Sequence, residues 1–227
     1  MARAPSNYQL LFTYVAPYFA YVIALMLPMA RTSRYAIASV AAAAALAYGW
    51  RWLLPLRGPR SVAGSVLLGG LAGVFGTALW VWIKRPFYEA GGDPWPLADF
   101  ALRVGASGTV VAVFEELLFR GLLLGGAVQW HRARREGDAD PLGTALHRRS
   151  VGTLEPGAWT GVAVLFSSVA FASGHAPGEW PAAFAYGLLM AALWIVRGDL
   201  LTPIVAHGTT NVTLALWVRH TGQWSLW

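Results

Sequence analysis

Long apolar runs dominate this sequence and limit the folds that it can adopt. Seven runs approach the roughly 20 residues that an α-helix needs to cross a lipid bilayer. They span residues 9–29, 35–56, 62–83, 101–126, 158–175, 180–196 and 201–218. We therefore predict an all-α fold: a polytopic membrane bundle of about seven transmembrane helices.

The composition supports a lipid environment. Hydrophobic residues make up 56% of the chain and charged residues only 12%, with a mean hydropathy of +0.49. A soluble domain carries about 25% charged residues because its surface faces water. The chain has no cysteine, which excludes disulfides, thiolate metal ligands and a cysteine nucleophile.

The formal net charge of +6 comes mostly from arginine. These residues lie between the apolar runs, where the positive-inside rule accounts for them, so we expect no nucleic-acid partner. With a cytoplasmic N-terminus, ten of the connecting basic residues fall inside and five outside. We therefore predict an integral protein of a bacterial inner (plasma) membrane, with the lipid bilayer as a partner and the N-terminus in the cytoplasm.

Small and aromatic residues fit a membrane bundle. Gly69 and Gly73, four residues apart, predict close approach of two helices. Several tryptophans, among them Trp80, Trp82 and Trp194, fall near the ends of predicted spans and are expected to form interfacial aromatic belts.

Three charged residues lie in the middle of the run 101–126. Glu115, Glu116 and Arg120 lie deep within it, where an ionised side chain costs about 2.5–3.5 kcal/mol. Glu116 and Arg120 are four residues apart and can form an ion pair on one helix face. Glu115 has no such partner on its own helix and needs one from elsewhere. The alternative is that all three residues only tie helices together.

Two further runs carry histidines. His175 ends the run 158–175, where a capping or interfacial role is the simplest alternative. His207 and Asn211 are four residues apart, on one face of an uncharged helix, where a polar contact between helices is the alternative. Together these residues offer a carboxylate and an imidazole to deprotonate water. A second imidazole and an amide N–H can stabilise an oxyanion, so the set suits peptide hydrolysis.

At these residues the sequence resembles the CAAX prenyl endopeptidase and bacteriocin-processing (CPBP, Abi) family of glutamic intramembrane proteases. Its motif Glu-Glu-x-x-x-Arg matches Glu115, Glu116 and Arg120. Its motif Phe-x-x-x-His matches Phe171 and His175, and its motif His-x-x-x-Asn matches His207 and Asn211. The resemblance covers about residues 100–215.

The resemblance implies an intramembrane endopeptidase. Glu115 and His175 would activate water, and His207 and Asn211 would stabilise the oxyanion. Glu116, Arg120 and Phe171 would support them. We predict no cofactor; zinc held by Glu115, His175 and His207 is the alternative. The substrate would be a membrane-anchored protein or peptide.

Straight spans would separate the two histidines in depth. His175 would lie near the external end of its helix, and His207 about six residues from the cytoplasmic end of another. We therefore predict that the turn 176–180 dips into the bilayer or that the last helix begins inside it, around a water-filled cavity.

These expectations give one integral-membrane domain over residues 1–227. Within it, residues 1–99 hold the three N-terminal helices and residues 100–218 the catalytic helical core. Two other functions fit the same polar residues: a non-catalytic membrane scaffold or immunity partner, and a proton-coupled transporter.

Overall fold

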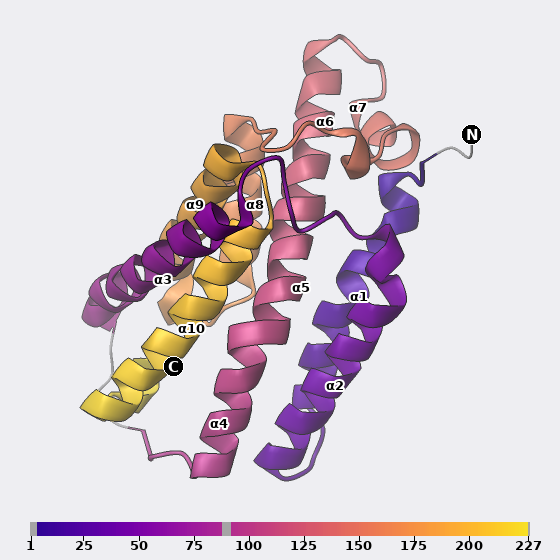
Figure 1. Ribbon diagram of the computed structural model, residues 1–227. Helices are drawn as coiled ribbons and strands as arrows, with labels where there is room; N and C mark the ends of the chain where they lie inside the picture. Colours follow the sequence, from indigo (N-terminus) through magenta and orange to yellow (C-terminus); the bar gives the residue numbers. More distant parts are fainter. Residues whose placement is uncertain (1–3, 88–91, 227) are drawn as a thin grey trace.

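A long helix runs through the middle of the molecule (Figure 1). The computed structural model describes residues 4–87 and 92–226. The central helix is continuous from Leu97 to Arg135. Its successive segments are α4 (Leu97–Ala106), η3 (Ser107–Val111), α5 (Ala112–Glu116), η4 (Leu117–Leu124) and α6 (Gly125–Arg135), of which η3 and η4 are π-helical. The central helix thus extends beyond the predicted run 101–126 at both ends.

The remaining chain is also helical. The longer helices are α1 (Asn7–Leu25), α2 (Arg31–Gly49), α3 (Val62–Lys84), α8 (Gly161–Ser173), α9 (Trp180–Arg197) and α10 (Leu201–Thr221). Short turns are η1 (Trp50–Trp52), η2 (Arg85–Phe87), α7 (Pro141–Gly143), η5 (Thr144–Arg148), η6 (Val151–Thr153), η7 (Pro177–Glu179) and η8 (Trp224–Leu226). No strand occurs in the described residues, which confirms the all-α class.

Helix length and hydropathy identify fewer membrane crossings than the sequence predicts. Three helical segments are long and apolar enough to cross a membrane within the described ranges: Asn7–Leu25, Val62–Phe87 and Pro177–Arg197. The seven predicted crossings are therefore not confirmed. In particular, α8 has 13 residues, about 20 Å of helix, whereas the apolar core of a bilayer is about 30 Å thick.

The helices form two groups around the central helix (Figure 1). The α1–α2 hairpin covers one side, and α3, α8, α9 and α10 pack together on the other. Large apolar side chains are exposed on the outer surface of both groups, including Phe12 (74%), Val40 (69%) and Leu67 (66%). A water-soluble monomer seldom exposes so much apolar surface, so a lipid environment explains it.

Helices α3 and α10 approach closely, as the glycine spacing predicts. A Cβ atom on Gly69 would lie 2.8 Å from the Thr202 carbonyl oxygen, and one on Gly73 would lie 2.6 Å from the Ala206 carbonyl oxygen. Real Cβ atoms do not tolerate such contacts, so only glycine permits this packing. The close approach lets the Thr210 hydroxyl on α10 donate to the Gly73 carbonyl on α3 (2.8 Å).

The turn between α9 and α10 fixes where α10 begins. Gly198 has a φ of +65°, which glycine adopts without strain. The buried Asp199 carboxylate accepts hydrogen bonds from the Thr202 backbone N–H (2.7 Å) and the Ser65 hydroxyl (2.7 Å). One carboxylate thereby caps the start of α10 and joins it to α3.

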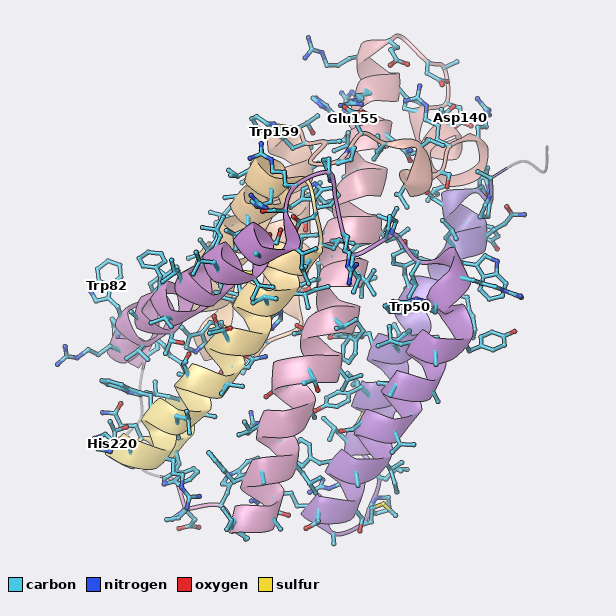
Figure 2. All side chains as sticks on the ribbon, viewed as in Figure 1. Trp50, Trp82, Asp140, Glu155, Trp159 and His220 are labelled. Atoms are coloured by element: carbon cyan, nitrogen blue, oxygen red, sulfur yellow. The ribbon has the colours of Figure 1, made fainter. Side chains whose placement is uncertain are left out.

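Two tryptophans differ from the belt prediction. Trp80 and Trp194 are only 8% and 9% exposed, and the Trp194 indole N–H donates to the Ala158 carbonyl. Trp82 is 72% exposed and points outward from α3, in agreement with an aromatic belt (Figure 2). Position along a span alone does not tell an inward tryptophan from an outward one, because the side of the helix also matters.

Candidate active site

One face of the central helix forms a wall of a partly open cavity. Arg103, Ser107, Val111 and Glu115 follow one another at four-residue intervals, and all four line this cavity of ≈ 160 Å³. In a regular α-helix, residues twelve positions apart differ by about 120° in direction. The π-helical segment η3 lies between Arg103 and Glu115, and its wider turn offsets that rotation.

All four residues that were predicted to be catalytic line this cavity. Glu115 comes from α5, His175 follows α8, and His207 and Asn211 come from α10. Residues far apart in the sequence thus meet at one place. The cavity also contains residues that the sequence analysis did not assign to the site, including Trp80, Arg103, Glu179 and Tyr186. None of these belongs to a short motif that could have revealed it.

The depth difference expected between the two histidines is absent. Both histidines line the same cavity, and His175 follows directly after α8 ends at Ser173 and Gly174. The ring of Phe171 contacts both histidines, with centroid distances of 4.8 Å to His175 and 5.9 Å to His207. Phe171 therefore holds the two imidazoles near one another.

Glu116 and Arg120 form the ion pair that their spacing predicted. Both side chains are completely buried, with 3.2 Å between Arg120 Nε and Glu116 Oε2. Arg120 also donates to the Gly187 carbonyl on α9 (3.0 Å), and its guanidinium carbon lies 4.8 Å from the centroid of the Phe171 ring. The pair thus joins the central helix to α8 and α9.

His207 connects the two glutamates. Its Nδ1 lies 2.8 Å from Glu116 Oε1, and its Nε2 lies 3.7 Å from Glu115 Oε2. The Glu116 carboxylate pairs with Arg120 and accepts hydrogen bonds only, so Nδ1 carries the donated proton. Nε2 then faces Glu115, at a distance too long for a direct hydrogen bond. The sequence analysis did not foresee this link between Glu116 and His207.

His175 and Asn211 are oriented by backbone carbonyls. His175 Nδ1 donates to the Phe171 carbonyl (3.0 Å), which leaves Nε2 as the nitrogen available to the cavity. One N–H of the Asn211 amide donates to the Ser107 carbonyl in η3 (2.8 Å). The amide group has a second N–H, so this contact fixes Asn211 without using all its donors.

No set of three or more His, Asp or Glu side chains in the described ranges is arranged to hold a metal ion. Glu115, His175 and His207 line one cavity but do not converge as ligands. A larger cavity of ≈ 250 Å³ lies between α1, α6 and α8, but its lining is almost entirely apolar and offers no acid or base.

A family model described as "Type II CAAX prenyl endopeptidase Rce1-like" matches residues 97–213. The matched segment begins with α4 and ends within α10, so it contains Glu115, His175, His207 and Asn211. Trp80 and helices α1 to α3 lie before it. No curated protein and no solved structure matches the chain.

Proposed function

The chain belongs to the family of type II CAAX prenyl endopeptidase Rce1-like proteins, and on this premise we propose that it is a glutamic intramembrane endopeptidase. It hydrolyses a peptide bond in a membrane-anchored protein or peptide. The observation that carries the proposal is the joint presence of Glu115, His175, His207 and Asn211 around one cavity inside the bundle.

Glu115 suits the role of general base. Its side chain is 16% exposed, and among the described residues its ion-pair neighbour within 4 Å is His207, whereas Glu116 pairs with arginine. In the proposed reaction, Glu115 and His175 orient a water molecule, and the Glu115 carboxylate takes one of its protons. The water oxygen bonds to the scissile carbonyl carbon. The C–N bond then breaks, and the proton passes to the departing amine.

His207 and Asn211 suit the stabilisation of negative charge on the carbonyl oxygen. Asn211 retains a second N–H, and His207 Nε2 donates when it carries a proton. Glu116 holds His207 through Nδ1, and Arg120 holds Glu116. Donors held in fixed positions stabilise a developing oxyanion without reorganisation. We therefore assign positioning roles to Glu116, Arg120 and Phe171.

For the membrane arrangement, we propose the predicted bundle of about seven membrane helices with the N-terminus in the cytoplasm of a bacterial cell. Arginine-rich segments at the end of α6 and after α7 would then face the cytoplasm. Reporter fusions at positions 138 and 92 would test this orientation, because the two sites should report opposite compartments.

The function is tested by cleavage of a quenched membrane-anchored peptide, with and without a prenyl group, by the protein reconstituted in nanodiscs. We expect Glu115→Gln to lower the rate by at least about 100-fold, because it removes the general base. Asn211→Ala should lower the rate by about 100-fold or more through loss of an oxyanion donor. Glu155→Gln removes an exposed carboxylate outside the cavity and serves as the control.

Two outcomes separate the alternatives. Cleavage that persists in a chelator supports the metal-free mechanism, whereas loss of cleavage that added zinc restores would support the zinc alternative. Full biological function of the Glu115→Gln protein would contradict the enzyme and favour the scaffold, since the Glu116–Arg120 pair already ties helices together.

A further inference from the structure

Trp80 places an unused hydrogen-bond donor beside the cavity. The residue is 8% exposed, and its indole Nε1 is buried with no hydrogen-bond partner among the described residues. The same side chain lines the cavity that contains Glu115 and His175. An indole N–H can only donate, and a buried donor without an acceptor is rare and destabilising. The position of Trp80 therefore calls for an acceptor from outside the described chain.

The surroundings of Trp80 show how it differs from other polar groups at the cavity. Its ring lies 5.6 Å from the His175 ring and 6.2 Å from the Tyr186 ring. His175 Nδ1 donates to Phe171, and the Tyr186 hydroxyl donates to Thr210 Oγ1 at 3.0 Å. Among the described residues that line the cavity, Trp80 is the one with a buried polar side-chain atom that lacks a partner.

We propose that the Trp80 indole N–H donates to a backbone carbonyl of the bound peptide and so positions the peptide next to His175. This inference rests on the proposed function and adds a substrate-binding residue from α3, outside the matched segment 97–213. A peptide that enters the cavity loses water from its carbonyl groups, and a fixed N–H replaces that water. Because Nε1 is covered in the free protein, binding requires a small shift of neighbouring side chains.

The first test is Trp80→Phe, which removes the N–H but keeps an aromatic ring between His175 and Tyr186. We expect KM to rise by about two- to tenfold, the effect of one hydrogen bond, while kcat changes little. Trp82→Phe is the matched control, because Trp82 lies two residues away on α3 and points outward (Figure 2). A purely structural role would lower the thermal stability of Trp80→Phe without this change in KM.

A binding measurement separates this inference from the catalytic proposal. A fluorescent prenylated CAAX peptide is titrated against Glu115→Gln protein and against the double variant that also carries Trp80→Phe. We expect the dissociation constant to be about two- to tenfold larger for the double variant. If the wild type does not cleave but Trp80→Phe still weakens binding, the catalytic proposal fails and the assignment of Trp80 stands.

Peptide analogues then identify the acceptor. Reduced-amide peptides replace one carbonyl with a methylene group at successive positions. At one position, the reduced amide should bind the Glu115→Gln protein more weakly than the unmodified peptide does. In the double variant with Trp80→Phe, the same reduced amide and the unmodified peptide should bind equally well, because the hydrogen bond is already absent. Equal affinities of the double variant and its parent would overturn the inference, as would failure of the peptide to bind the Glu115→Gln protein.

Discussion

Two groups of charged residues lie in this chain, one inside the bundle and one at its outer end. The inner group consists of Glu115, Glu116, Arg120 and His207, of which Glu116 and Arg120 are fully buried. The outer group occupies the segment from Arg132 to Glu155, between the end of α6 and the start of α8. The two groups use similar residue types in very different environments.

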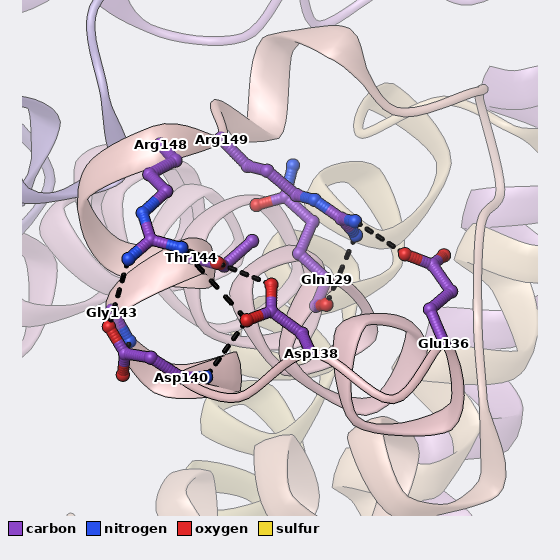
Figure 3. A network of polar contacts seen from close by, with 8 residues as sticks. All are labelled: Gln129, Glu136, Asp138, Asp140, Gly143, Thr144, Arg148 and Arg149. Carbon is purple, nitrogen blue, oxygen red and sulfur yellow. Dashed lines mark hydrogen bonds and ion pairs between the residues drawn. The ribbon is translucent and has the colours of Figure 1, made fainter.

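In the outer group, ion pairs join side chains of the polar segment between α6 and α8 (Figure 3). Arg149 lies 2.7 Å from Glu136, and Arg148 lies 3.2 Å from Asp140. Arg132 pairs with Glu155, which is 59% exposed. Water already solvates these charges, so each pair contributes little free energy.

In the inner group, the contacts of Glu116 have a larger effect on the free energy of folding. The Glu116 carboxylate is shared between Arg120 and His207 and is fully buried. A buried charge that loses its partner keeps the full cost of desolvation. The inner pairs therefore determine the geometry of the site, whereas the outer pairs shape a surface segment.

Removal of the Arg120 side chain should lower the free energy of unfolding more than any other change predicted below. Arg120→Ala leaves the buried Glu116 without its cation, and we expect a loss of about 3–5 kcal/mol in the free energy of unfolding. Denaturant titration in detergent micelles measures this loss. Replacement of both Glu116 and Arg120 by leucine should recover most of the stability but not cleavage. If Arg120→Ala cost no more than Arg134→Ala at the surface, the distinction between the two groups would fail.

Replacement of Asn7, which lies beneath the outer group, should have an intermediate effect on the free energy of unfolding. Asn7 is 3% exposed; its amide donates to Gln129 Oε1 (2.5 Å), and its carbonyl accepts from the Val151 backbone N–H (2.6 Å). Asn7→Leu leaves these buried partners unsatisfied, so we expect a loss of about 1–3 kcal/mol. The same denaturant titration measures it. Phe12→Leu, on the exposed side of α1, is the control, and an equal loss there would contradict the explanation.

Loss of the outer pair Arg132–Glu155 should have the smallest effect on the free energy of unfolding. Hydrogen bonds from the Arg132 guanidinium lower the pKa of the Glu155 carboxyl from 4.5 to about 2. The lowered pKa means that the stabilisation is complete above about pH 4.5 and is lost as pH falls toward 2. Because the pair is exposed, Arg132→Ala should cost at most about 1 kcal/mol at neutral pH.

NMR titration of Glu155 checks this prediction. In Arg132→Ala, the pKa of Glu155 should rise toward its ordinary value, since the main cause of the shift is removed. High salt should also weaken the outer pair but leave the buried Glu116–Arg120 pair largely unaffected. An unchanged Glu155 pKa in Arg132→Ala would show that another group causes the shift.

Much of the fold was predictable because hydrophobic periodicity and length are local properties. Each predicted apolar run overlaps a helix, and the Glu116–Arg120 pair follows from a four-residue spacing. The predictions were weaker where they depended on helix ends. The short α8 and the extension of the central helix to Arg135 were both missed.

The sequence by itself determined the helical class, the family and the residue types around Glu115, because short motifs within single helices carry that information. Only the tertiary structure decided that His207 bridges both glutamates, that η3 turns Arg103 and Glu115 toward one cavity, and that Trp80 faces inward. These features depend on how separate helices approach and rotate. Such contacts arise from the packing of whole surfaces, which no local spacing in the chain specifies.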